Sequence, residues 1–247
     1  MYLDWRPWRI PVATVPASDI RKAAPGPHPG AVAVVSAVLF ALSLAVLGNS
    51  AAGTRFPHPD DSPSAMQAYF LANAAHAQLC ALFQFGAAIA LGIFTAAATN
   101  RLHSLGIRAT GVRIALFGGW LAAFNSLLVA SLIWVLAQSG VAQDAAVAHA
   151  IYLFAFALGG TGYAAAIGLL CAGLSLPSLF SGLLPRWLAI CGLVIAVIGE
   201  LSWLGLILPR FDICIPLARF PGYLWVIAAG FTLPRSVSQK TDQGSRS

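Results

Sequence analysis

One ionisable side chain interrupts an otherwise apolar stretch of the sequence. Glu200 is the only glutamate in the chain and lies inside VIAVIGELSWLGLIL, residues 194–208. A carboxylate near the centre of a membrane-spanning helix is unfavourable by about 2.5–3.5 kcal/mol, and such residues usually face the interior of a helix bundle. We therefore expect Glu200 to point toward the next apolar segment and to pair with Arg219, with Trp203 as a wall of the same pocket.

A second interpretation applies if Arg219 lies at the membrane surface. Glu200 should then be neutral, because an isolated buried charge is costly, and should hydrogen-bond to Asn125 or to a histidine. Asn125 lies near the middle of its apolar segment, and its alternative role is an ordinary hydrogen bond between helices. Most of the polar residues in the apolar segments fall on the same side of the predicted bilayer, which favours a polar pocket open to the outside.

Two histidines, His76 and His149, lie near the predicted outer starts of two apolar segments. Neutral imidazole is the commonest metal ligand in proteins, so the pair could bridge a metal or a haem between two helices. Only Cys80 follows in helical register with His76, and the chain has neither HExxH nor CxxCH. The alternative is that both histidines are side chains at the membrane surface, and we expect no cofactor.

The composition identifies the solvent of the chain as lipid. The sequence is 59% apolar and 9% charged, with a mean hydropathy of +0.80, whereas a soluble domain has about 25% charged residues. The net charge of +6 does not indicate nucleic-acid binding, because the charges gather in tails and short loops. The four cysteines show no metal-ligand spacing, and we expect them to be small buried residues.

These residues must be positioned by membrane-spanning helices, each of which needs about 20 apolar residues. We predict an all-α, polytopic membrane protein, a six-helix transmembrane bundle at 29–234 between tails at 1–28 and 235–247. We favour an uncleaved first helix over a removed signal peptide. The predicted spans are 31–48, 73–98, 112–137, 147–173, 187–208 and 213–233.

The arginines and lysines give the predicted direction of the chain. They concentrate in both tails and in the second and fourth loops, where examples are Arg101, Arg108 and Arg186. Cytoplasmic loops carry such a positive excess, so we predict that both termini are cytoplasmic. The abundance of alanine and of arginine over lysine suggests a bacterial source, and hence a multi-pass protein of the plasma (inner) membrane.

The loops carry three further predictions. Ser62 and Pro63 are expected as the N-cap and first residue of a helix that begins outside the membrane. Residues 174–187, interrupted by Pro177 and Pro185, are expected to lie as a loop along the cytoplasmic surface. Pro221 leaves open whether the last helix begins before or after Arg219. His58, Asp60 and Asp61 could hold a divalent cation, although such clusters are usually only hydrated.

Three stretches resemble an uncharacterised bacterial family of six-helix integral membrane proteins that contain a domain of unknown function. They are FPHPDDSPSAMQAYF (56–70), LPRWLAICG (184–192) and FPGYLWVIAAGFTL (220–233). The resemblance covers helices two to six and not the N-terminal tail. It implies a six-helix bundle in a bacterial inner membrane, and it implies no activity or catalytic residue.

Three functions are consistent with these patterns. The first is binding or transport of a small, largely apolar ligand through an outer-facing polar pocket, with membrane lipids as the surroundings. The second is a non-catalytic subunit or regulator of a membrane complex. The third is an intramembrane haem or metal enzyme. The first would use Glu200, Arg219, Asn125 and Trp203, and the third His76 and His149. An enzyme is the less favoured class, and the oligomeric state is left open.

Overall fold

A computed structural model describes residues 26–48 and 55–234, and these are helical throughout with short connections. The longer helices are α1 (Pro29–Gly48), α3 (Ala74–Ser104), α4 (Thr110–Leu136), α6 (Ala145–Ala157), α7 (Tyr163–Ser181), α8 (Arg186–Leu201) and α9 (Cys214–Thr232). The shorter ones are α2 (Pro63–Ala72), α5 (Ser139–Ala142), the π-helical turn η3 (Leu158–Gly162), and the 3₁₀ turns η4 (Ser202–Leu206) and η5 (Pro209–Ile213).

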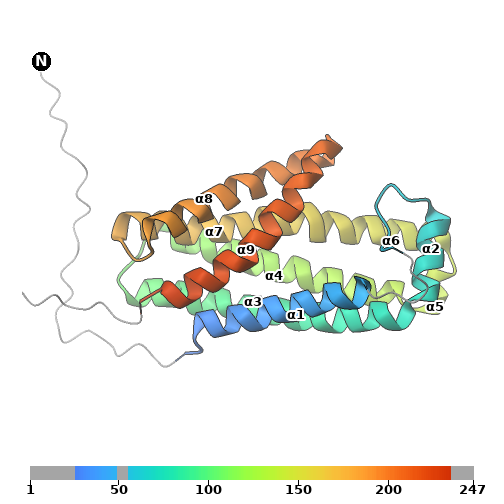
Figure 1. Ribbon diagram of the computed structural model, residues 1–247, viewed down its shortest axis with the longest axis horizontal. Coiled ribbons are helices and arrows are strands. Elements are labelled where there is room, and N and C mark those ends of the chain that lie inside the picture. Colours follow the sequence, from blue (N-terminus) through green and yellow to red (C-terminus); the bar gives the residue numbers. More distant parts are fainter. Residues whose placement is uncertain (1–25, 49–54, 235–247) are drawn as a thin grey trace, which may run out of the picture.

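Six of these helical stretches are long and apolar enough to cross a membrane, as predicted. The fourth, Ala145–Ser181, joins α6, η3 and α7 into one continuous span. Figure 1 shows the spans as an elongated bundle in which α9 crosses the others diagonally. The described ends of the chain meet at one end of the bundle, where His28 packs against Phe231 with 5.2 Å between ring centroids. We call this the terminal face and the opposite end the α2 face.

The α2 face is covered by short helices that lie across the ends of the long ones (Figure 1). Helix α2 begins as predicted, because the Ser62 side chain accepts a hydrogen bond from the Ala65 amide at 3.2 Å and Pro63 is its first residue. The chain breaks at Asn73, so α2 is a separate helix and not the start of α3. Asp144 caps α6 by accepting from the amides of Ala146 and Val147.

Proline interrupts the helices less than the sequence predicted. The expected loop at 174–187 is wrong, because α7 continues through Pro177 to Ser181 and ends at Gly182, whose φ of 68° stops the helix. Likewise, α9 begins at Cys214 and continues through Pro221. Neighbouring helices stabilise prolines inside membrane helices, and Pro177 packs against Gly111 of α4. Arg219 therefore lies within a helix.

Small residues set the distance between the long helices. A side chain at Gly173 of α7 would approach the backbone of α4 to 2.4 Å, and one at Gly199 of α8 would approach the Ala164 carbonyl of α7 to 2.4 Å. Such close approach gives van der Waals contact where lipid offers no hydrophobic driving force between helices. The consequence is a tightly packed α4–α7–α8 layer, against which α9 and α1 complete the bundle.

Candidate functional site

The polar residues that the sequence singled out do not converge on one pocket. Arg219 is the one that meets a group of aromatic residues inside the bundle. Its guanidinium carbon lies 4.7 Å from the centre of the Tyr163 ring on α7 and 5.6 Å from that of Phe40 on α1. Tyr223, one helical turn after Arg219 on α9, stacks on Phe40 with 4.7 Å between centroids. We call these four residues the Arg219 site.

The rings of the Arg219 site form a stack from three helices. Tyr223 lies between Phe40 and Tyr163, at 15° to the first ring and 21° to the second. All three rings are buried, with Tyr163 2% and Tyr223 5% exposed. Arg219 itself is half-buried. Part of the Arg219 residue is therefore open to the surface of the bundle, while its guanidinium lies against the rings of Tyr163 and Phe40.

One hydrogen-bond donor in this site, the Nε of Arg219, is fully buried and has no partner among the described residues. The buried hydroxyl of Tyr163 has the hydroxyl of Tyr223 as its hydrogen-bonding neighbour. The two ion pairs of the described chain, Arg55–Asp61 and His58–Asp60, lie outside the membrane-spanning segments. Within the described residues, the charge of Arg219 is thus balanced by aromatic rings and by no carboxylate.

A comparison of free energies indicates that the aromatic rings alone do not compensate the cost of burying Arg219. A cation over an aromatic ring gains about 0.5–2 kcal/mol. An arginine at membrane depth costs about 2.5–3.5 kcal/mol on insertion scales, and each buried donor without an acceptor costs a further 1–3 kcal/mol or so. Two cation–π contacts offset the first of these costs but not the cost of the unpaired Nε–H. The site is one that an added acceptor would stabilise.

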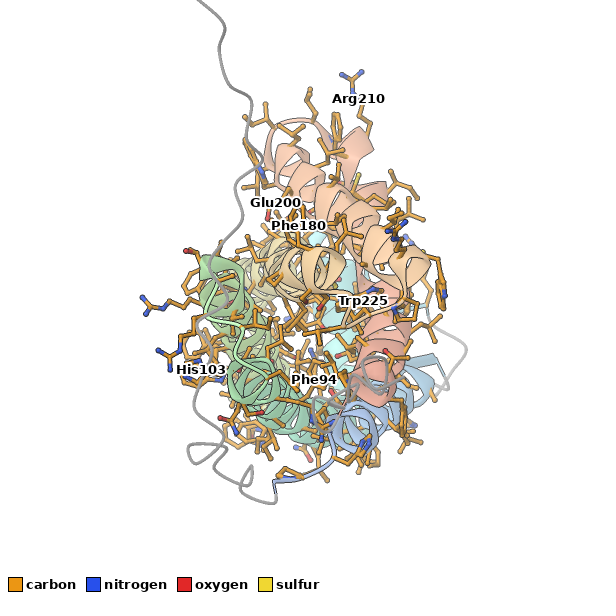
Figure 2. The ribbon with its side chains drawn as sticks, turned by 90° about the vertical axis from the view of Figure 1, so that its left-hand side faces the viewer. Phe94, His103, Phe180, Glu200, Arg210 and Trp225 are labelled. Atoms are coloured by element: carbon orange, nitrogen blue, oxygen red, sulfur yellow. The ribbon has the colours of Figure 1, made fainter. Side chains whose placement is uncertain are left out.

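Glu200 does not belong to this site, and the prediction that it faces the bundle interior and pairs with Arg219 is wrong. Its side chain is exposed at the side of the bundle, where Figure 2 labels it. It has no hydrogen bond or ion pair to a described residue. The inward face of α8 is the stripe Gly192, Ala196 and Gly199, which packs against α7 and α9, and Glu200 lies at the edge of that stripe.

Glu200 and Trp203 line the same surface groove. They were expected from the sequence to share a pocket, although one inside the bundle. The groove encloses about 410 Å³ between α7 and the end of α8. Its remaining lining is apolar, and Trp203 is 50% exposed. In a bilayer this groove faces lipid or another membrane helix. Its lining residues are Ala172, Leu193, Ala196, Val197, Glu200, Leu201, Trp203 and Leu204.

Asn125 is buried on α4 against the π-helical turn η3. A side chain at Gly162 would meet the Asn125 amide nitrogen at 3.0 Å, so the amide lies directly on this turn. On its other side, a side chain at Gly160 would meet Ile215 of α9 at 3.1 Å. A π-helical turn often marks a functional position in a helix, and this one immediately precedes Tyr163. Asn125 supports the element that positions Tyr163.

His76 and His149 are both half-buried near the α2 face, but on helices that are not packed side by side. Helix α4 packs along both α3 and α6, which carry the two histidines. The Nε2 atom of His149 is buried without a hydrogen-bond partner. Within the described residues no group of three or more histidine, cysteine or acidic side chains is arranged to hold a metal. The bridging metal or haem stays a prediction without geometric support.

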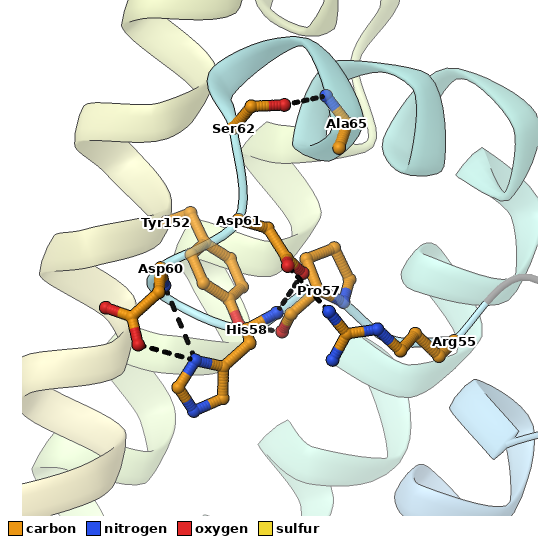
Figure 3. Close-up of polar contacts among 8 residues, drawn as sticks. All are labelled: Arg55, Pro57, His58, Asp60, Asp61, Ser62, Ala65 and Tyr152. Carbon is orange, nitrogen blue, oxygen red and sulfur yellow. Dashed lines mark hydrogen bonds and ion pairs between the residues drawn. The ribbon is translucent and has the colours of Figure 1, made fainter.

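The predicted cation cluster is occupied by its own hydrogen bonds (Figure 3). Asp61 accepts from Arg55 at 2.6 Å and from the His58 amide at 2.7 Å, and His58 contacts Asp60 at 3.3 Å. Tyr152 of α6 donates to the Pro57 carbonyl. These contacts hold the 55–62 loop against the bundle. The acidic residues of the loop therefore have a structural role.

The sequence did not single out Phe40, Tyr163 or Tyr223. Their signal is weak, because aromatic residues are common in membrane helices and a ring becomes part of a site only through its neighbours. The turn LGGTG at 158–162 was the available sign, since three glycines within five residues precede Tyr163. Of the four cysteines that were expected to be buried, Cys80 and Cys171 are buried, whereas Cys214 is half-buried and Cys191 is exposed.

No protein-family model, curated protein or solved structure matches the chain. The resemblance of 56–70, 184–192 and 220–233 to a six-helix membrane family stays a prediction.

Proposed function

We propose that the protein binds or transports a small, largely apolar ligand at the Arg219 site. The observation that carries this proposal is the buried Nε of Arg219, which has no acceptor among the described residues. Such groups are rarely left unpaired, because each costs the free energy of its lost hydration. A ligand acceptor at this position would remove that cost, and the surrounding rings would contact the apolar remainder.

The proposed ligand enters from the α2 face or laterally between α1 and α9. A hollow of about 280 Å³ lies at the end of α1 and includes Leu44, one helical turn beyond Phe40, together with Leu47 and Phe56. We take the α2 face as the outer side of a bacterial inner membrane, with both termini in the cytoplasm. The opposite, terminal face carries Arg101, Arg108, Arg113 and Arg186, which agrees with that orientation because cytoplasmic loops hold the positive excess.

Replacement of Phe40 by alanine tests the proposal. The change removes one wall of the Arg219 site and should release a bound ligand, because the ring covers the guanidinium at 5.6 Å. Native mass spectrometry of protein purified in mild detergent should find a retained small molecule or lipid in the unmodified protein and less of it in Phe40→Ala. Phe180→Ala is the matched control, because Phe180 is 82% exposed. The absence of any retained molecule from the unmodified protein would contradict the proposal.

A second candidate, a non-catalytic subunit of a membrane complex, is favoured by the position of Glu200. An unpaired carboxyl group in a lipid-facing groove is expected to meet a polar group of another membrane segment. Glu200→Gln should then weaken recovery of the complex from mild detergent, whereas Asp212→Asn, which changes a carboxyl group outside the groove on the same hairpin, should not. A single-species preparation that both variants leave unchanged would count against this candidate.

A further inference from the structure

The chemistry of the Arg219 site also indicates the class of ligand. We propose that the ligand is an anionic amphiphile, with an acidic head group on Arg219 and a hydrocarbon body against the aromatic rings. This inference rests on the proposed function and adds to it the charge and shape of the molecule bound.

The first step is the sign of the charge. Arginine is permanently protonated in proteins, and no acidic side chain of the described chain pairs with Arg219. Glu200 is exposed in the α7–α8 groove, and Asp61 is held by Arg55 at 2.6 Å on the α2 face. Because no internal carboxylate compensates this cation, a ligand that brings a negative charge gains more here than a neutral ligand of the same shape.

The second step is the geometry of the donors. A guanidinium presents its N–H groups as a planar fork, which matches the paired oxygens of a carboxylate or a phosphate. The Tyr163 ring, which is 2% exposed, lies against that fork, with its centre 4.7 Å from the guanidinium carbon. Because the Nε–H of the fork has no acceptor among the described residues, a ligand with more than one oxygen could bind two N–H groups of the guanidinium at once.

The third step is the apolar body. Phe40 and Tyr223 cover the inner side of the site, and Phe220, whose ring centre is 6.4 Å from that of Phe40, is 50% exposed on the outer surface of α9. Leu217 and Leu224 on α9 are also exposed. The half-buried Arg219 therefore lies between an aromatic wall and a lipid-facing surface. A hydrocarbon chain can extend from it into the bilayer.

Two sources could supply such a molecule, a free long-chain acid or the head group of an anionic lipid. The test uses palmitate and hexadecanol, which have equal chain length and differ in charge, as competing probes of the purified protein in neutral nanodiscs. Palmitate should bind at least about tenfold more tightly than hexadecanol, because charge-assisted hydrogen bonds to a fork are the strong ones. In a parallel arm, native mass spectrometry of protein from mixed phosphatidylglycerol and phosphatidylcholine membranes reports lipid retention.

Substitutions test whether the preference for palmitate over hexadecanol depends on the Arg219 site. Arg219→Gln should lower palmitate affinity by about tenfold and leave hexadecanol binding unchanged, and Arg219→Lys should lower palmitate affinity less. Arg210→Gln is the matched control, because Arg210 points away from the bundle at the tip of the same hairpin (Figure 2). Size-exclusion profiles establish that each variant is folded.

The outcomes separate the inference from the function on which it rests. Preferential retention of phosphatidylglycerol that Arg219→Gln abolishes, without palmitate binding, supports the inference and identifies the lipid head group as the source. Equal affinity for palmitate and hexadecanol, with no lipid preference, overturns the anionic class and leaves the binding function standing. If no probe or lipid binds at all, both the function and the inference fail.

Discussion

At the scale of single residues, Arg219 and Glu200 both have no ion pair in the described part of the chain, and they lie in different environments. Arg219 is half-buried among rings from α1, α7 and α9, whereas Glu200 is exposed on the side of α8. The sequence could predict that both are unusual, because each is a lone charge in an apolar segment. It could not predict their separation, because this depends on how far α8 and α9 are rotated about their own axes.

The stripe of small residues on α8 is the sequence feature from which the orientation of Glu200 could have been predicted. Gly192, Ala196 and Gly199 recur at helical spacing, and small residues mark the face that packs against other helices. Glu200 follows this stripe at its edge, so a consistent interpretation of the stripe predicts a position beside the packed face. The aromatic partners of Arg219 had no comparable signal, because Phe40 is 179 residues away from it in the chain.

Replacement of Glu200 by leucine should stabilise the isolated protein. The carboxyl group has no partner among the described residues and borders an apolar groove, so a side chain that lipid solvates should raise the free energy of unfolding by about 1 kcal/mol or more. Thermal unfolding of the purified protein in nanodiscs measures the change, with Asp212→Asn as the control for loss of a carboxylate. A fall in the unfolding temperature of Glu200→Leu would show that the carboxyl group has a stabilising partner.

At the scale of elements, hydropathy predicted the six spans but not where each helix bends or breaks. The break at Asn73 separates α2 from α3, although the sequence from Pro63 onward is uniformly compatible with one helix. Conversely, Pro177 and Pro221, which could each have ended a helix, lie inside helices. The tertiary packing decides these cases, because a neighbouring helix can hold a proline turn that an isolated helix would not form.

The contact between α4 and α7 should be sensitive to a single methyl group. In Gly173→Ala the new Cβ would lie 2.4 Å from the Ala115 amide nitrogen and 2.5 Å from the Gly111 carbonyl, so the two backbones must separate. Overpacking of this kind costs about 1–3 kcal/mol. Gly92→Ala is the matched control, because its Cβ meets its nearest neighbour at an ordinary 3.8 Å and alanine favours the helix. Equal unfolding temperatures for the two variants would contradict this account of the packing.

At the scale of the whole molecule, the two ends of the bundle differ in charge. The connections at the terminal face carry Arg101, Arg108, Arg113 and Arg186 and no acidic residue in the described chain. The α2 face and the α8–α9 hairpin tip carry Asp60, Asp61, Asp144 and Asp212 with Arg55 and Arg210. This charge asymmetry could be predicted from the sequence, because the end of the bundle at which a charged residue lies depends only on the number of membrane spans before it.

The charge asymmetry predicts the orientation of the protein in the membrane. Positive residues are retained on the cytoplasmic side during insertion, so the terminal face should be cytoplasmic and the α2 face should be external. Gln143→Cys beside α5 and Ser104→Cys at the end of α3 lie exposed at the two opposite ends of the bundle (Figure 1). In a background without the native cysteines, a membrane-impermeant maleimide should label Gln143→Cys in intact cells. It should label Ser104→Cys only after the cells are opened. The reverse pattern would place the terminal face outside, and the proposed ligand would then have to reach Arg219 from the cytoplasm or from the lipid.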